Sequence, residues 1–297
     1  MTTDAPATDD VPDPRRPLRV DVLRRRLLVP TGPVDRLEVT DRTGSTNTDL
    51  ADAVRAGGEG WDGVTVLVTE HQVDGRGRSG RAWQTPAAAA LTFSVALRPT
   101  APTATWGWLP LLVGLAAVTA LRSTSGVPAT LKWPNDLMVD VPGAPDLDGW
   151  GTQRKLGGIL VELARGAAGP VAVAGVGINV SQTAAELPVP TARSLRGAGA
   201  RDLDREALLV TLLESLGAVC RRWQDAAGDA GRAGLAEEVA AACSTLGRPV
   251  RVELPGGGVL AGTATGLGQD GALLLRDAGG ATHAVRAGDV RHVREAR

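Results

Sequence analysis

The chain has 297 residues, a formal net charge of −1 and 43% hydrophobic residues, so it can bury the core of one large domain or of two. The near-neutral charge argues against a generally basic nucleic-acid-binding protein. Two cysteines, Cys220 and Cys243, are too few for a disulfide framework. Their alanine-rich surroundings predict buried, inert thiols in a cytoplasmic protein. The longest apolar run, residues 109–121, is too short to span a bilayer, and no secretory signal precedes it, so we expect no membrane partner.

The residue usage is strongly biased toward arginine. Lys132 and Lys155 are the only lysines among 32 basic residues. The only asparagines are Asn47, Asn135 and Asn179. Because arginine is a planar fork and lysine a compact point charge, a chain that keeps so few lysines indicates positions where arginine does not serve. The bias therefore marks these five residues as functional candidates.

The first elements are short. Residues 1–17 are rich in Pro, Asp and Thr and are predicted to be disordered. Residues 18–28 follow as an amphipathic helix, and residues 36–40 as a strand. The space before residue 36 holds one helix, which is too little for a helix-turn-helix.

The next segment, Gly44–Leu50, is typical of a helix start. Thr46 as N-cap, with Asp49 three residues later, forms an acidic capping box, and Gly57-Gly58 ends the helix. An ordinary cap and a ligand site at the helix N-terminus are both compatible with this pattern.

Strands over residues 64–70 and 91–97 flank an arginine- and glycine-rich loop, Gly75–Trp83. Arginine forks bind carboxylates and phosphates, and glycines let backbone N–H groups approach an anion. The glycines also make the loop costly to order. The loop is therefore an anion-binding candidate, although a solvated turn or an RNA-binding Arg/Gly segment has the same composition.

An apolar helix over residues 110–122 precedes a strand over residues 130–139 that Pro134-Asn135-Asp136 interrupts as a turn. Lys132 then lies at a strand end next to the turn, which is a common position for functional side chains. The alternative interpretation is a solvated surface lysine, but a chain with only two lysines disfavours it, since arginine would serve equally well there.

A Pro/Gly/Asp-rich insertion at residues 141–153 precedes strands over residues 155–162 and 171–180. In the second strand, Gly175-Val176-Gly177 leaves room on one face for a flat group. Asn179 could then read the edge of that group with its donor and acceptor. Close packing of strands explains the glycines equally well.

Two helices follow, over residues 203–225, capped by Asp202 or Asp204, and over residues 232–246. The remaining sequence predicts a small β-barrel-like module. Its expected strands are residues 250–254, 259–264, 272–275 and 282–285.

The chemistry of the chain comes from its cations. The three histidines are scattered and predict no metal site, no P-loop pattern occurs, and no nucleophile stands beside a base. Arginines and a lysine alone suggest positioning and charge stabilisation at a phosphoryl centre.

Taken in order, the motifs resemble those of the biotin–protein ligase family, the biotin–[acetyl-CoA-carboxylase] ligases, over about residues 36–297. The resemblance rests on five motifs: Gly44–Asn47, Gln72 with Gly75–Trp83, Lys132–Asp136, Lys155–Glu162 and Gly175–Asn179.

The resemblance implies an α+β fold. The catalytic domain, residues 18–246, would be like that of class II aminoacyl-tRNA synthetases and biotin/lipoate ligases, with a mixed sheet flanked by helices. A small SH3-like β-barrel, residues 247–297, would follow it.

The resemblance also implies a two-step reaction with ATP, Mg²⁺ and biotin. Biotin is converted to biotinyl-5′-AMP and then transferred to a lysine of the biotin carboxyl carrier domain of an acyl-CoA carboxylase. The protein would act as a monomer or weak homodimer. Because residues 1–35 are too short for the winged helix-turn-helix of repressor-type members, we expect no DNA binding.

By the same resemblance, Lys132, Arg76 and Arg78 are the expected catalytic residues. The biotin-binding set is Ser45, Thr46, Asn47, Gln72, Gly75, Arg76, Gly77, Arg78, Lys132 and Gly158. The ATP-binding set is Arg78, Arg81, Trp83, Lys132, Asn135, Lys155 and Asn179.

Two features depart from the family pattern. Asp74 replaces a small neutral residue beside the arginine loop, and the insertion at residues 141–153 has no assigned role. A lipoate–protein ligase of the same fold is the nearest alternative, and an RNA-binding module is a more distant one. One Phe and no Tyr give RNA few stacking platforms.

Overall fold

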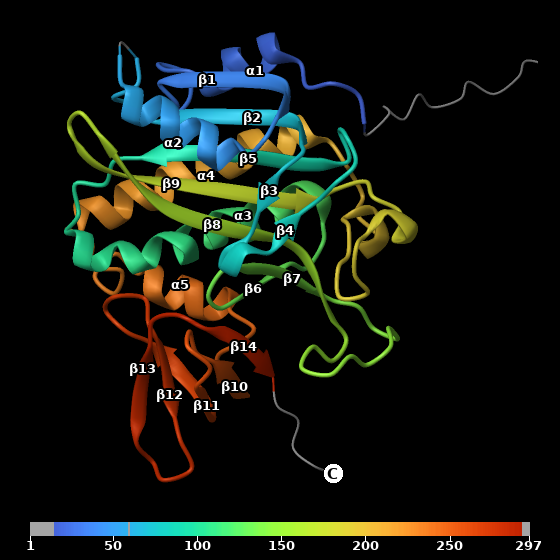
Figure 1. The fold of residues 1–297 in the computed structure, drawn as a ribbon, viewed down its shortest axis with the longest axis vertical. Coiled ribbons are helices and arrows are strands. Elements are labelled where there is room, and N and C mark those ends of the chain that lie inside the picture. Colours follow the sequence, from blue (N-terminus) through green and yellow to red (C-terminus); the bar gives the residue numbers. More distant parts are fainter. Residues whose placement is uncertain (1–14, 59, 293–297) are drawn as a thin grey trace, which may run out of the picture.

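The computed structural model describes residues 15–58 and 60–292, so the predicted disordered tail lies almost wholly outside the described residues. A seven-stranded sheet forms the larger part of the molecule, and a five-stranded sheet packs below it (Figure 1). Helices cover one face of the large sheet almost completely and the other face only in part. This α+β arrangement confirms the expected fold class.

The large sheet has the order β1-β2-β5-β9-β8-β7-β6, and all its neighbours are antiparallel except β1 and β2. Gly157 of β8 shows how closely the central strands approach, since a β-carbon there would lie 2.3 Å from the carbonyl oxygen of Gly177 in β9. The strands are β1 (Arg36–Thr43), β2 (Thr65–Gln72), β5 (Ala90–Leu97), β6 (Thr130–Lys132), β7 (Asp136–Asp140), β8 (Gln153–Gly166) and β9 (Gly169–Asn179).

The covered face carries the main hydrophobic core. Its helices are α1 (Val20–Leu27), α3 (Leu109–Ser125), α4 (Arg205–Asp225) and α5 (Leu235–Ala242). Helix α3, with the 3-10 turn before it, is long and apolar enough to cross a membrane, but most of it is buried inside the protein as a core helix. Helix α2 (Thr46–Ala56) packs alone on the opposite face through Leu50, Ala51 and Val54, and leaves the rest of that face for a site.

Helix α5 is shorter than the helix predicted over residues 232–246. It begins after Gly234, whose φ of +70° is left-handed, and ends at Cys243, which is extended. Cys243 forms a bridge with Leu131, and the amide of Ser244 donates to the Leu131 carbonyl at 2.7 Å. The chain therefore leaves the helix early because it pairs with the edge strand β6.

The C-terminal sheet contains the four predicted strands and a fifth that was missed, β14 (Asp289–His292). Its antiparallel order is β13-β12-β11-β10-β14. Two indole N–H groups from outside this sheet hold its β11–β12 turn. Trp108 donates to the Gln269 carbonyl at 2.9 Å, and Trp133 donates to the Gly271 carbonyl at 3.1 Å. The other strands are β10 (Pro249–Glu253), β11 (Val259–Leu267), β12 (Leu273–Arg276) and β13 (Thr282–Val285).

Candidate functional site

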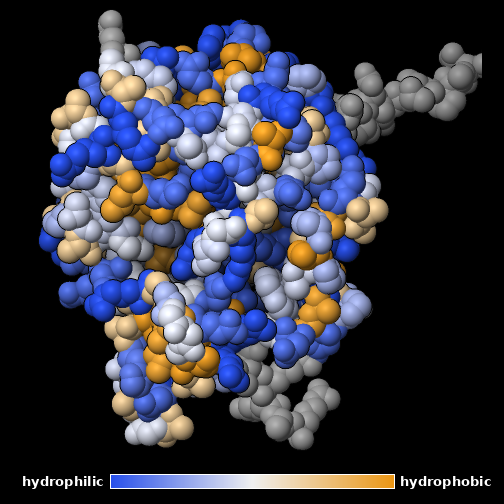
Figure 2. Space-filling view, in the orientation of Figure 1, coloured by the Kyte–Doolittle hydropathy of each residue, from blue (hydrophilic) through white to orange (hydrophobic). Residues whose placement is uncertain are grey.

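A cavity of about 600 Å³ opens on the face that α2 leaves uncovered, and hydrophilic residues gather around the middle of this face (Figure 2). Its walls come from the start of α2, the arginine loop, the β6–β7 turn, strands β8 and β9, the insertion before β8, and β14. Every predicted site residue except Gly75 lines it. The five motifs therefore meet at one place.

The start of α2 forms the most buried wall. Ser45, not Thr46, is the N-cap, so the predicted cap was one residue late. The Thr46 amide and hydroxyl instead donate to Oε1 of Gln72 at 2.9 and 3.1 Å, which fixes Thr46 as the first helical residue. Ser94, which sequence reasoning missed, donates to the Thr46 hydroxyl at 2.8 Å and to the Asn47 side chain at 2.6 Å. This wall is a fixed array of hydroxyl and amide groups.

Asn47 is used mainly to hold the wall together. Its Nδ2 donates to the Leu160 carbonyl at 3.1 Å and to Glu162 at 2.8 Å, which ties α2 to β8. A β-carbon on Gly175 would lie 2.4 Å from Asn47 Oδ1. Gly175 therefore makes room for this asparagine.

Gly75 lies behind the cavity wall. It belongs to β3 (Gly75–Arg76), which pairs with β4 (Ala82–Trp83) as the base of the arginine loop. A β-carbon at Gly75 would lie 2.3 Å from Gln72 Nε2 and 2.4 Å from the Trp83 carbonyl. Gly75 thus allows the loop base to close against Gln72.

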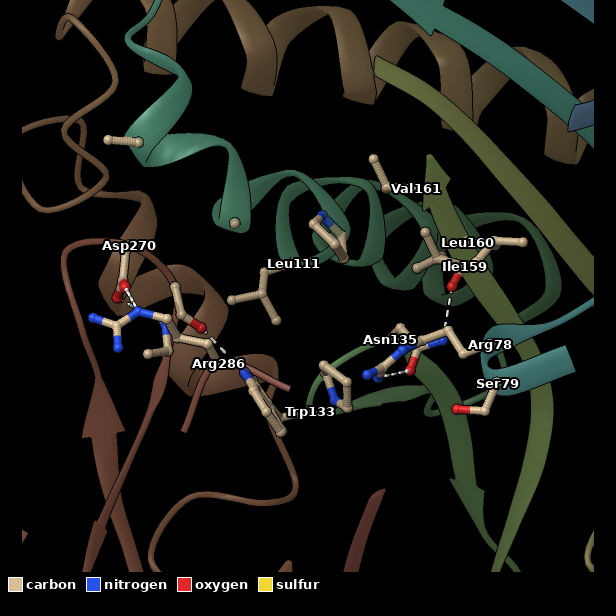
Figure 3. Close-up of a pocket in the computed structure, with 16 residues that line it drawn as sticks. Arg78, Ser79, Leu111, Trp133, Asn135, Ile159, Leu160, Val161, Asp270 and Arg286 are labelled. Carbon is tan, nitrogen blue, oxygen red and sulfur yellow. Dashed lines mark hydrogen bonds and ion pairs between the residues drawn. The ribbon is translucent and has the colours of Figure 1, made fainter. Parts of the chain in front are cut away.

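The arginines of the loop have three different partners. Arg76 forms an exposed ion pair with Asp74 at 3.0 Å, and Arg81 pairs with Asp289 of β14. Arg78 donates to the Asn135 side chain at 3.1 Å, and Asn135 in turn donates to the Ile159 carbonyl at 2.7 Å (Figure 3). Burial lowers the pKa of Arg78.

Lys132 lies at the end of β6 and is 4% exposed. Burial, its largest influence, lowers the pKa of its ammonium group. The ammonium lies 4.3 Å from the ring centroid of Trp150, which belongs to the insertion. Asp136, the nearby carboxylate, is instead paired with Lys155 at 2.5 Å.

The charges around the cavity are unevenly compensated. Six cations line the cavity, and four of them form an ion pair with a carboxylate among the described residues. Three of these pairs, of Arg76, Arg81 and Lys155, are given above, and the fourth joins Arg291 to Glu253 at 2.9 Å. The other two, Lys132 and Arg78, form no ion pair with a carboxylate of residues 15–58 or 60–292. A buried cation without a carboxylate is costly, so the cavity is prepared for an anionic group.

Trp83 occupies the space that was predicted to hold a flat ligand over Gly177. A β-carbon on Gly177 would lie 2.6 Å from the Trp83 ring, and the buried indole N–H of Trp83 has no hydrogen-bond partner within residues 15–58 and 60–292. Asn179 lines the cavity, but its side chain bonds to the Arg193 carbonyl at 3.2 Å and to Gln182 at 3.0 Å. The amide nitrogen and the amide oxygen of Asn179 thus both bond to other described residues. Recognition of adenine by Asn179 stays a prediction.

Other lining residues had no local signal in the sequence. Asp289 and Arg291 reach the cavity from a strand far from the motifs, and Trp150 reaches it from the insertion before Lys155. Gly158 leaves room for Lys155, whose ammonium would lie 3.2 Å from an added β-carbon. The described residues hold no group of three or more His, Cys, Asp or Glu side chains that could bind a metal ion.

Comparisons with known proteins agree with this geometry. Residues 39–179 match the Biotin/lipoate A/B protein ligase family, and residues 245–293 match the biotin protein ligase C-terminal domain. The chain is 40% identical to a biotin–[acetyl-CoA-carboxylase] ligase of Mycobacterium tuberculosis over 94% of this chain and 97% of that protein. It is 33% identical to the bifunctional ligase/repressor BirA of Escherichia coli over 84% of this chain and 70% of that protein.

A solved structure supports the same relationship. The biotin protein ligase of Aquifex aeolicus in complex with biotin and ATP superposes with a TM-score of 0.67 at 26% identity. The match covers 88% of this chain and all of that one. With its sheet order, its cavity and the five motifs around it, the chain belongs to the biotin–protein ligase family.

Proposed function

We propose that the protein is a biotin–[acetyl-CoA-carboxylase] ligase that acts in two steps. A biotin carboxylate oxygen attacks the α-phosphorus of ATP, the bond to pyrophosphate breaks, and biotinyl-5′-AMP remains in the cavity. The amine of an acceptor lysine then attacks the carbonyl carbon, the bond to AMP breaks, and the amine loses a proton. The acceptor is the biotin carrier domain of an acyl-CoA carboxylase, as the activity of the mycobacterial relative implies.

The observation that carries this proposal is the pair of cations that form no ion pair among the described residues, Lys132 and Arg78. The carboxylate and the α-phosphate repel each other, so the reactants approach only where positive charge offsets that repulsion. Four neighbouring cations are already paired, so these two remain to receive the substrates. We assign Lys132 and Arg78 to the reacting centre on this charge argument. Arg76, whose ion pair with Asp74 is exposed, joins them through the family resemblance alone.

The remaining wall divides into two halves. The hydroxyl and amide array at Ser45, Thr46 and Gln72 suits the polar ring system of biotin, with the adjacent loop backbone over its tail. The half beyond Lys132 suits ATP: Trp83 provides a flat face for adenine, and Arg81 lies toward the phosphates.

Mg²⁺ enters as part of the nucleotide substrate. Mg²⁺ in ATP-dependent enzymes is held largely by phosphate oxygens and water, with one or two carboxylates. The cavity provides Asp136 and Asp289, each in an ion pair with a cation. These residues fit an ion that arrives with ATP better than one that the protein holds alone.

We further propose that the protein works in the cytoplasm, as a monomer or weak homodimer, without sequence-specific DNA binding. The described part of the chain ahead of β1 contains the single helix α1. A footprint on a specific operator would contradict the last expectation.

Biotin-dependent exchange of pyrophosphate into ATP tests the first step, and transfer of labelled biotin to a purified carrier domain tests the second. We expect both with biotin and neither with lipoate. Exchange with lipoate alone would make the protein a lipoate ligase. Salt-sensitive RNA binding without exchange would favour the Arg/Gly-loop alternative.

A further inference from the structure

The insertion between β7 and β8 is held in place by Arg154, a residue of β8 that directly follows it. Arg154 is 5% exposed, and its guanidinium donates to the carbonyls of Gly151 at 3.0 Å, Gln153 at 2.9 Å and Pro145. Leu147 and Gly151 form an antiparallel bridge across the tip. The insertion therefore has a defined conformation that can aim a side chain.

The tip of the insertion reaches the reacting centre. Gly149, with a φ of +71°, packs so closely on Arg291 of β14 that an added β-carbon would lie 3.2 Å from that side chain. The next residue, Trp150, lines the cavity and places its ring 4.3 Å from the Lys132 ammonium. The insertion thus spans the space between β14 and the end of β6.

An aromatic face differs from a carboxylate as a partner for a buried lysine, because it attracts the ammonium without cancelling its charge. A carboxylate would hold Lys132 more strongly, but it would also neutralise the cation and repel the two anionic reactants. The neighbouring Lys155 shows the contrast, since Asp136 pairs with it directly. An indole can orient the ammonium and leave its full charge for a ligand.

We infer that Trp150 is a positioning residue for the adenylation step: its indole face holds the Lys132 ammonium in the cavity at full charge. The inference rests on the proposed function and gives the insertion, residues 141–153, a role in the reaction. Because the interaction acts on a charge needed most in the transition state, its loss falls on kcat rather than on KM for biotin.

The test compares Trp150→Phe, which keeps a π face, with Trp150→Leu, which keeps apolar volume alone. We expect Trp150→Leu to lower kcat for pyrophosphate exchange by roughly threefold to thirtyfold, the range of a cation–π contact from exposed to desolvated. Trp150→Phe should recover most of this loss. KM for biotin should stay within about twofold in both variants.

A double-mutant cycle separates positioning from packing. In a Lys132→Met background, Trp150→Leu should have no further effect on kcat, because the group that it positions is gone. Thermal melting of each variant shows whether it is folded.

The outcomes are distinct. A wild-type protein without biotin-dependent exchange removes the proposed function itself. With an active wild type, the inference is overturned by a Trp150→Leu variant with normal kcat, by equal losses in the Leu and Phe variants, or by additive losses in the cycle.

Discussion

Replacing Lys132 by methionine should move activity and stability in opposite directions. Methionine has a similar length and no charge, and Lys132 is 4% exposed without an ion pair among the described residues. The substitution removes a cation that the substrates need and also removes the cost of burying it. A residue whose role is only structural would not behave in this way.

The size of the activity loss follows from the charge. A cation about 4 Å from an opposite charge gains about 4 kcal/mol at an effective dielectric constant of about 20, of which the transition state uses a part beyond the ground state. Removing one preorganised group of this kind typically costs about 10²- to 10³-fold in kcat. Arg78 remains in the variant, so we expect residual activity in that range rather than complete loss.

The size of the stability gain follows from desolvation. Apolar replacement of a buried charge stabilises by about 1 kcal/mol or more when no partner is left behind. For a chain of this size, about 1 kcal/mol corresponds to roughly 2 °C in Tm. The cation–π contact with Trp150 is lost in the same variant and offsets part of this gain.

The assay is single-turnover formation of biotinyl-5′-AMP, measured beside thermal melting of the same preparations. Lys155→Met is the matched control because it removes the only other lysine and leaves the Asp136 carboxylate, 2.5 Å away, without its partner. We expect that control to lose stability. A Lys132→Met variant within fivefold of wild-type activity, or one with a lowered Tm, would refute the reasoning.

Three further outcomes are expected. Gly75→Ala should raise KM for biotin in steady-state kinetics by at least tenfold, since its β-carbon collides with Gln72. The control Gly77→Ala meets only an ordinary contact at 3.5 Å, so its KM should stay within about twofold of the wild-type value. Burial lowers the pKa of Lys132, and the substrates need its charged form, so exchange activity should begin to fall at a pH below the ordinary lysine pKa of 10.5. A pH–rate profile that stays level up to pH 10.5 would contradict this. Burial raises the pKa of Cys220 to about 12, so this thiol should react with a disulfide reagent only after denaturation; rapid labelling of the native protein would contradict its burial.

The lysine pKa also affects stability, with a definite sign. Between the lowered folded value and 10.5, the unfolded chain carries a proton on Lys132 that the folded chain has lost. Unfolding then takes up a proton, so this residue makes the folded state more stable as pH rises through that window. Below the window, both states are protonated and the full burial cost of the charge remains.

The sequence was most informative where function and local structure use the same residues. The loop at Gly75–Trp83, the turn after Lys132 and the strand ending at Asn179 are each bounded by strand patterns, so their places at the ends of β2, β6 and β9 could be predicted. Their convergence at one site followed from the family resemblance and not from these patterns. The scarcity of lysine pointed to Lys132 independently of any motif.

Contacts between residues far apart in the sequence determine the features that local patterns did not predict. Ser45 and Thr46 are both good capping residues, and it is Gln72, twenty-six positions away, that takes up Thr46 and leaves Ser45 as the cap. Strand β14 has one apolar side chain, Val290, so its pairing with β10 has no periodic signal. Trp150 lies in a segment with a turn-like composition, and only the fold brings it to Lys132.

The anchoring of the β11–β12 turn by Trp108 and Trp133 has a consequence for synthesis of the protein. During translation, the motifs around Lys132 leave the ribosome well before β14, yet Asp289 and Arg291 of that strand form part of the cavity wall. A chain in which β14 is not yet in place lacks this part of the wall, so an anhydride formed there would be open to hydrolysis.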